Sequence, residues 1–170
     1  MKEIKDGIVM ETEYIRVCNP PFLVPKLSGK IRKILDCRQV NKITNLTQFK
    51  MEGTKFIKQI LTPHDYAKTF DLENVFHHVT VSDSLLPYFG FAFLVRAFAY
   101  RGHPFGYKNS LYIFNKILKI VQKEMKKRWR VKLANYIDDI ILMKKDEEVQ
   151  NRITIGVIQF LKDLGWRLQA

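Results

Sequence analysis

The pattern of hydrophobic and polar residues is clearest between residues 131 and 143, where two apolar segments flank two adjacent acids, Asp138 and Asp139. The first segment alternates apolar and polar residues, and the second, residues 140–143, is apolar throughout. Segments of this kind are typical of β-strands, and aspartate is common in turns. The pattern therefore predicts a β-hairpin with the two acids at its turn.

Other segments also have a strand-like pattern. Residues 22–24 and 31–35 flank a glycine-containing turn with several cations, and they predict a second hairpin. Residues 66–72 predict a strand that ends at Asp71. Residues 82–84 predict a helix start, and the aromatic-rich residues 88–100 predict the end of that helix followed by strands.

Apolar residues recur at helical spacing in three segments. Residues 54–61 predict a short helix, and residues 146–164 predict a longer one with acids in its first turn and Gly165 just after its end. Thr62 and Pro63 suit the N-cap and first position of another helical turn. Residues 113–125 predict an amphipathic helix whose other face carries five lysines, which we interpret as its solvated face.

Together these elements predict an α+β fold. The strand that ends at Asp71 and the hairpin at Asp138 can form one antiparallel sheet. The two long helices would then pack on a single face of that sheet and leave the other face free for a ligand.

Composition adds a class of partner. The chain has 170 residues, is 46% hydrophobic and carries a formal net charge of +12, which suits one domain that binds nucleic acid. A generally basic surface is the alternative. Cys18 and Cys37 have neither metal-ligand nor disulfide spacing, and we see no signal peptide and no apolar run of the roughly 18 residues that a membrane span needs. We therefore expect an intracellular protein, in cytoplasm or nucleus, that is not secreted and has no membrane partner.

The adjacent acids also carry chemistry. Two neighbouring carboxylates repel each other, and an Asp-Asp pair is a poor turn because it does not supply a positive φ cheaply. The same pair is a good ligand set for Mg²⁺. A solvated turn with two acids by chance is the alternative. If Asp71 lies beside the hairpin, three carboxylates could hold two metal ions about 3.5–4 Å apart.

Five motifs in order resemble those of reverse transcriptases, between residues 19 and 166. The first in the chain is the fingers signature, at Val24-Pro25-Lys26, Gly29-Lys30, Arg32 and Asp36-x-Arg38-x-x-Asn41. The first acidic motif follows at Asp71-Leu72-Glu73-Asn74-Val75-Phe76, and then Pro104-Phe105-Gly106 with Ser110 and Phe114. The last two are the YxDD box at Tyr136-Ile137-Asp138-Asp139 and the palm motif Leu164-Gly165-Trp166. The sequence around these motifs is more similar to retrotransposon enzymes than to retroviral ones. The resemblance implies a palm plus a fingers hairpin, with fingers at about residues 1–45 and 78–109 and palm at 46–77 and 110–170.

The resemblance implies an RNA-directed DNA polymerase that adds dNTPs to a primer by two-metal phosphoryl transfer. By resemblance, Asp71, Asp138 and Asp139 are catalytic and hold two Mg²⁺ ions, with Mn²⁺ as an alternative ion. The backbone carbonyl of Leu72 would complete one metal shell. Tyr136 would lie near the primer terminus.

Further roles follow from the same resemblance. The residues implied in dNTP binding are Lys26, Arg32, Leu72, Phe76, Phe105 and Gly106, with Lys30 as an alternative to Lys26 on the hairpin. Phe76 falls at the sugar-discriminating position, and its alternative is a core phenylalanine. Arg38 would shape the template path or the fold, and Lys108 would be a template-side or structural contact.

The chain also departs from the family pattern. Leu111 stands where many members have proline, and the sequence ends at Ala170 before the lysine, the thumb and the ribonuclease H region expected next. We therefore expect a fragment of a polyprotein that works with the remaining segments, a primed RNA or DNA template and dNTPs. The alternatives are a non-catalytic RNA-binding domain with a palm fold and an inactive remnant.

Overall fold

The computed structural model describes residues 2–25, 29 and 31–169. In chain order the elements are α1 (Lys2–Lys5), β1 (Val9–Glu11), β2 (Pro21–Pro25), β3 (Ile31–Leu35), α2 (Arg38–Ile43), α3 (Thr54–Ile60), β4 (Tyr66–Asp71), the 3-10 helices η1 (Val75–His78) and η2 (Leu86–Phe89), β5 (Gly90–Phe93), β6 (Arg96–Tyr100), α4 (Ser110–Trp129), β7 (Lys132–Tyr136), β8 (Asp139–Lys144) and α5 (Glu147–Asp163). Among the described residues, no helix is long and apolar enough to cross a membrane.

The chain folds into two compact units. Unit 1 consists of Met1–Gln48 and Phe76–Ile113, and unit 2 consists of Phe49–Val75 and Phe114–Ala170. The chain thus passes from unit 1 to unit 2, back to unit 1 and again to unit 2. The residue boundaries expected from the sequence for fingers and palm stay a prediction.

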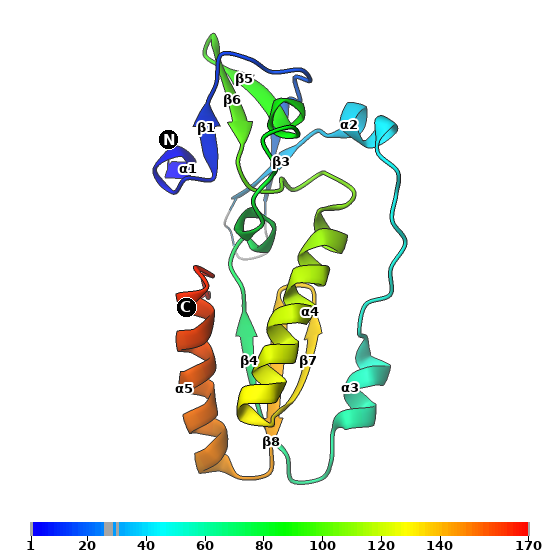
Figure 1. The fold of residues 1–170 in the computed structure, drawn as a ribbon, viewed down its shortest axis with the longest axis vertical. Helices are drawn as coiled ribbons and strands as arrows, with labels where there is room; N and C mark the ends of the chain where they lie inside the picture. The colour runs from blue at the N-terminus through cyan, green and yellow to red at the C-terminus, as the bar shows by residue number, and fades with distance from the viewer. Residues whose placement is uncertain (1, 26–28, 30, 170) are drawn as a thin grey trace. The chain divides into compact units, whose positions relative to one another are not determined.

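Unit 2 contains the predicted antiparallel sheet, with strand order β4-β8-β7 (Figure 1). The hairpin of β7 and β8 is confirmed, and β4 pairs with β8 from Tyr66 opposite Lys144 to Asp71 opposite Asp139. The turn itself differs in detail from the prediction. It is formed by Ile137, with φ +54°, and Asp138, whereas Asp139 already belongs to β8.

Both long helices of unit 2 pack on one face of this sheet. On α4, the amide of Gln122 donates to the side chain of Asn135 on β7 over 2.6 Å, and both residues are buried. On α5, the amide of Gln150 donates to the backbone carbonyl of Leu142 on β8. The core between these elements consists of Phe114, Leu118, Val121, Met125, Leu133, Ile140, Leu142, Ile153, Val157, Leu161 and Trp166. Figure 1 shows α4 lying across β7 and β8.

The predicted helix in residues 146–164 is confirmed as α5. The Asp146 carboxylate accepts a hydrogen bond from the Val149 N–H over 2.9 Å and so caps the helix N-terminus. Gly165 follows the helix with φ +79°, in the left-handed region where glycine has no steric penalty.

Unit 1 combines the three-stranded antiparallel sheet β1-β6-β5 with the predicted hairpin of β2 and β3. Its core consists of Val9, Leu35, Cys37, Val40, Val81, Phe89, Phe91, Phe98 and Tyr100. The backbone N–H of Leu35, the last residue of β3, donates to the carbonyl of Phe105 over 2.9 Å. This bond joins the hairpin to the Pro104-Phe105-Gly106 loop.

The prediction of a helical turn at Thr62 and Pro63 is wrong. The residues between α3 and β4 form a turn, in which the Thr62 backbone N–H and hydroxyl both donate to the Asp65 carboxylate. The ammonium of Lys132 on β7 binds the same carboxylate over 2.8 Å. The Asp65 carboxylate therefore caps the turn, and a distant lysine holds that carboxylate in place. The helix expected from residues 82–84 is only the short 3-10 helix η2.

Candidate active site

Two of the three predicted catalytic acids lie opposite each other on neighbouring strands of unit 2. Asp71 ends β4 and Asp139 begins β8, and their Cα atoms are register partners. The Leu72 N–H donates to the Asp138 carbonyl over 3.0 Å, which makes Asp71 and Asp139 a non-hydrogen-bonded antiparallel pair. Pairs of this type bring their Cα atoms to about 4.5 Å and their side chains closest. Strand register therefore sets the two carboxylates side by side.

Negative charge on Asp139 is disfavoured by its surroundings. Burial and the neighbouring charge of Asp138 raise the pKa of Asp139 above its usual range. The ionised form of Asp139 is therefore disfavoured, and a divalent cation would offset the repulsion from Asp138. Asp138 is half-buried in the turn just before.

The acids suit a hard cation because their donors are carboxylate oxygens and because Asp71 and Asp139 lie opposite each other. Carboxylate oxygens are the ligands that Mg²⁺ takes in proteins. Across the described part of the chain, however, no three His, Cys, Asp or Glu side chains gather closely enough to form a complete metal site. The observed arrangement is thus a facing pair, Asp71 and Asp139, with Asp138 next to it.

The backbone around Asp71 is held from two sides. Leu72 is buried and forms an isolated antiparallel bridge with Leu168. The Gln169 N–H donates to the Asp71 carbonyl, and the Glu73 N–H donates to the Arg167 carbonyl. Neither of these two bonds uses the Leu72 carbonyl, which we expect to reach a metal. Nothing in the sequence pattern singled out residues 167–169 as a support for the acids.

Tyr136 lies opposite Asp139 in the register of β7 and β8. Cross-strand partners lie on the same face of a sheet, so Tyr136, Asp139 and Asp71 share one face. Asn135, one residue earlier, points to the opposite face, where it meets α4. The tyrosine side chain is 53% exposed and accessible to a ligand on the acid face.

In unit 1, three of the residues expected to bind dNTP form a cluster of contacts. The guanidinium carbon of Arg32 lies 4.8 Å from the centre of the Phe105 ring. The Phe105 ring lies 4.7 Å from the ring of Phe76. Arg32 Nε is buried and has no hydrogen-bond partner among the described residues. These three side chains come from three separate segments, so only tertiary structure brings them together.

The ring of His77 also belongs to this cluster, in a structural role. Its ring meets Phe105 edge-on at 5.6 Å, and its Nδ1 lies 3.1 Å from the His103 carbonyl. Burial is the main cause that lowers the pKa of His77 to about 4. The imidazole is therefore neutral at physiological pH and adds no charge beside Arg32.

Gly106 is required by backbone geometry. Its φ is +112°, and a Cβ at this position would overlap the backbone carbonyl oxygen of Leu35. The Asn41 amide donates to the Gly106 carbonyl over 2.9 Å and accepts from the Lys108 N–H over 3.0 Å. The Lys108 ammonium donates to the Asn41 carbonyl. The structure thus places Lys108 in a brace around Asn41, while its template-side role stays a prediction.

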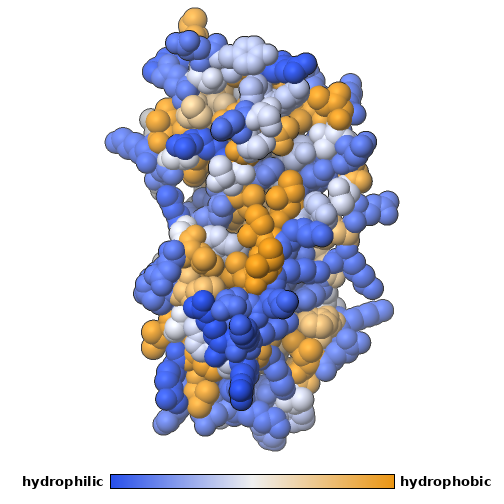
Figure 2. Space-filling view, viewed as in Figure 1, coloured by the Kyte–Doolittle hydropathy of each residue, from blue (hydrophilic) through white to orange (hydrophobic). Residues whose placement is uncertain are grey.

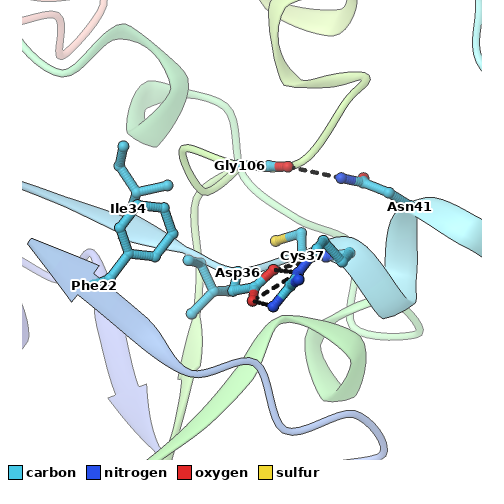
Figure 3. A pocket seen from close by; sticks show the side chains of 8 residues that line it. Phe22, Ile34, Asp36, Cys37, Asn41 and Gly106 are labelled. Carbon is cyan, nitrogen blue, oxygen red and sulfur yellow. Dashed lines mark hydrogen bonds and ion pairs between the residues drawn. The ribbon is translucent and has the colours of Figure 1, made fainter. Parts of the chain in front are cut away.

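A cavity of about 470 Å³ lies beside this brace in unit 1 (Figure 3). It is lined by Phe22, Ile34, Leu35, Asp36, Cys37, Arg38, Asn41 and Gly106. The Arg38 guanidinium forms a forked ion pair with the Asp36 carboxylate, at 2.6–3.0 Å, and its side chain is 85% exposed. Burial, chiefly, raises the pKa of the Cys37 thiol to about 12, so this thiol stays protonated. Lys26 lies outside the described residues.

A family model described as reverse transcriptase (RNA-dependent DNA polymerase) matches residues 24–170. The chain belongs to the reverse transcriptase family. It is 28% identical over 155 residues to the Gag-Pro-Pol polyprotein of Human T-cell leukemia virus 2, a match that covers 86% of this chain and 11% of the polyprotein. It is 25% identical over 163 residues to the Transposon Tf2-3 polyprotein of Schizosaccharomyces pombe (strain 972 / ATCC 24843), covering 94% of this chain and 12% of that polyprotein. The chain thus spans about a tenth of the length of these relatives.

Solved reverse transcriptases share the fold. The foamy viral protease-reverse transcriptase in complex with ds DNA matches with a TM-score of 0.83 and 23% identity, over 98% of this chain and 28% of that chain. The same enzyme in complex with an RNA/DNA hybrid matches with a TM-score of 0.81 and 22% identity, over 98% and 22% of the two chains. These matches confirm the predicted α+β class, with a palm-type antiparallel sheet and a fingers hairpin.

Proposed function

We propose that this reverse transcriptase domain adds deoxynucleotides to a primer on an RNA or DNA template. The facing pair of Asp71 and Asp139, with Asp138 beside it, carries the proposal. In this reaction the primer 3′-hydroxyl attacks the α-phosphorus of a dNTP, and the bond to pyrophosphate breaks as the new phosphodiester bond forms. Both the attacking and the leaving oxygen develop negative charge, which cations stabilise.

The three acids would hold two Mg²⁺ ions, which when bound lower the pKa of the attacking hydroxyl and neutralise the leaving pyrophosphate. The chain's own part is to fix the carboxylates. The antiparallel register positions Asp71 and Asp139, and the bonds from Leu72 to Asp138 and from Gln169 to Asp71 hold their backbone. Burial and the charge of Asp138 raise the pKa of Asp139 in the free chain, and attraction between the carboxylates and bound cations would offset both effects.

Arg32 would bind the triphosphate in the proposed reaction. Its unpartnered Nε supports this role, because a buried guanidinium donor is costly unless an acceptor reaches it. Phe105 holds the plane of the guanidinium by cation–π contact, and Phe76 supports Phe105 from a second ring. In this proposal the Phe76 ring also rejects a 2′-hydroxyl, which would make dNTPs the preferred substrate.

Nucleic acid as partner rests on two observations. The foamy viral relatives were solved in complexes with ds DNA and with an RNA/DNA hybrid. This chain carries a net charge of +12, which attracts a polyanion. We propose the same class of partner here.

The test is primer extension on a poly(rA)/oligo(dT) hybrid with Mg²⁺ and dTTP. Asp138→Asn should abolish extension and leave hybrid binding largely unchanged. Asp83→Asn, which removes an exposed acid of unit 1, is the matched control and should extend normally. Unchanged extension by Asp138→Asn would refute the metal assignment. If the chain binds hybrid but does not extend it even when fused to a related thumb, the non-catalytic RNA-binding alternative is favoured.

A further inference from the structure

A basic surface lies in unit 2, where α3 and α4 meet. A cavity of about 630 Å³ is lined by Lys50, Met51, Glu52, Gly53, Thr54, Lys55, Phe56, Gln59 and Lys119. The Lys126 ammonium of α4 lies 5.9 Å from the centre of the Phe56 ring of α3, so the two helices are neighbours here. We refer to this cavity and the adjoining exposed lysines of α4 as the α3–α4 groove.

The exposed side of α4 extends this surface with a row of cations. Lys119, Lys123 and Lys127 are exposed and four residues apart, which spaces them by about 6 Å along the helix axis. Figure 2 shows hydrophilic side chains gathered over the C-terminal half of α4. A regular row of ammonium groups is complementary to a chain that carries one charge at every repeat.

The acids near the groove do not cancel this charge. Among the lining residues the only acid is Glu52, whose carboxylate accepts the backbone N–H of Asn135. On α4, Glu124 is paired with Arg128 one turn later. The groove therefore has a net positive charge that its own acids leave uncompensated.

This surface is separate from the candidate active site. Asn135 faces α4, whereas its neighbour Tyr136 lies on the opposite face of the sheet with Asp71 and Asp139. The exposed lysines lie on the side of α4 that points away from the sheet, because the side with Gln122 is buried against it. A ligand on the α4 row is therefore separated from the acids by the helix and the sheet.

We propose that the α3–α4 groove binds single-stranded nucleic acid. The lysines contact successive phosphates, and the cavity with its half-buried Phe56 accepts a base. A cationic groove that contains an aromatic ring is the usual combination for sequence-tolerant binding of single strands. The proposal does not depend on catalysis by Asp71, Asp138 and Asp139. In a polymerase, the groove would hold a second, unpaired stretch of nucleic acid.

The experiment measures the affinity of labelled oligo(dT) by fluorescence anisotropy across a salt series, with EDTA present so that metal at the acids plays no part. Each phosphate contact contributes about 0.7 to the slope of log affinity against log salt. The triple variant Lys55→Gln/Lys119→Gln/Lys123→Gln should therefore reduce the slope by about 2. Phe56→Leu keeps an apolar side chain but removes the ring, and should weaken binding about tenfold without changing the slope.

The matched control removes three cations that lie on and beside α5, outside the α3–α4 groove. Lys145→Gln/Arg152→Gln/Lys162→Gln changes the net charge equally at exposed positions on and beside α5, and should leave most of the slope intact. Circular dichroism melts verify that all variants fold. An equal loss of slope in both triple variants would overturn the proposal, because diffuse attraction would then suffice. Equal competition by duplex DNA or by an acidic peptide of the same charge would overturn the single-strand assignment.

Discussion

Replacing Leu94 by Asn and Val95 by Gly should stabilise the protein. These residues form the turn between β5 and β6, with φ of +47° and +63°. A two-residue hairpin turn with two positive φ values favours Asn-Gly, because branched side chains collide with the backbone there. Here the turn has two bulky apolar residues instead.

The size of the effect follows from strain and exposure. An L-residue in the left-handed region costs roughly 1–2 kcal/mol, and Asn tolerates this region while Gly has no penalty there. Leu94 is 77% exposed and Val95 is fully exposed, so their removal loses little packing. The extra freedom of Gly in the unfolded chain takes back about 0.5–1 kcal/mol. A net stabilisation of about 1–2 kcal/mol remains, equivalent to a rise in Tm of about 2–8 °C for a chain of this size.

Thermal unfolding followed by circular dichroism measures this change. The control is Leu94→Ala/Val95→Ala, which removes the same exposed apolar surface but retains side chains at positive φ. We expect a clearly smaller rise in Tm for the control. A decrease in Tm for the Asn-Gly variant, or an equal increase in both, would refute strain as the cause.

Three further predictions concern the two units. Gly106→Ala should destabilise the protein by about 1–3 kcal/mol in denaturant unfolding, because φ is positive and the Cβ overlaps the Leu35 carbonyl; an unchanged midpoint would contradict this. The hydrogen bond from Lys132, foremost, lowers the pKa of Asp65 from 3.8 to about 2. The Asp65–Lys132 pair therefore stabilises the fold above about pH 4, and this contribution is lost as pH falls towards 2. Lys132→Met should reduce the stability at neutral pH and flatten its decline with falling pH. An unaltered pH profile of stability would contradict this. Phe76→Ala should increase ribonucleotide incorporation, and unaltered sugar selectivity in extension assays would remove Phe76 from the proposed gate.

The sequence determined the elements of unit 2 that depend on local pattern. Alternation in residues 131–136 and the apolar run in residues 140–143 fixed a hairpin, because a strand exposes successive side chains on opposite faces. Asp146 and Gly165 marked the ends of α5 for similarly local reasons, a carboxylate cap and a positive φ. The motif order also indicated the family, which the family match confirms.

Local pattern failed where a distant residue decides the conformation. Thr62 and Pro63 have the chemistry of a helix start, yet the Asp65 carboxylate, held by Lys132 from β7, fixes a turn instead. The turn at Leu94 and Val95 has no turn signature, because the pairing of β5 with β6 imposes its φ values. In both places long-range contacts outweigh local preference.

The candidate site shows the same division. The sequence could name Asp71, Asp138 and Asp139, but only the pairing of β4 with β8 sets Asp71 opposite Asp139. The contact of Arg32 with Phe105 likewise joins residues far apart in the chain. Residue type and spacing determined which groups are present, since these are local properties of the chain. Strand register and side-chain packing decided which groups meet, because they depend on contacts between segments that no short window of sequence contains.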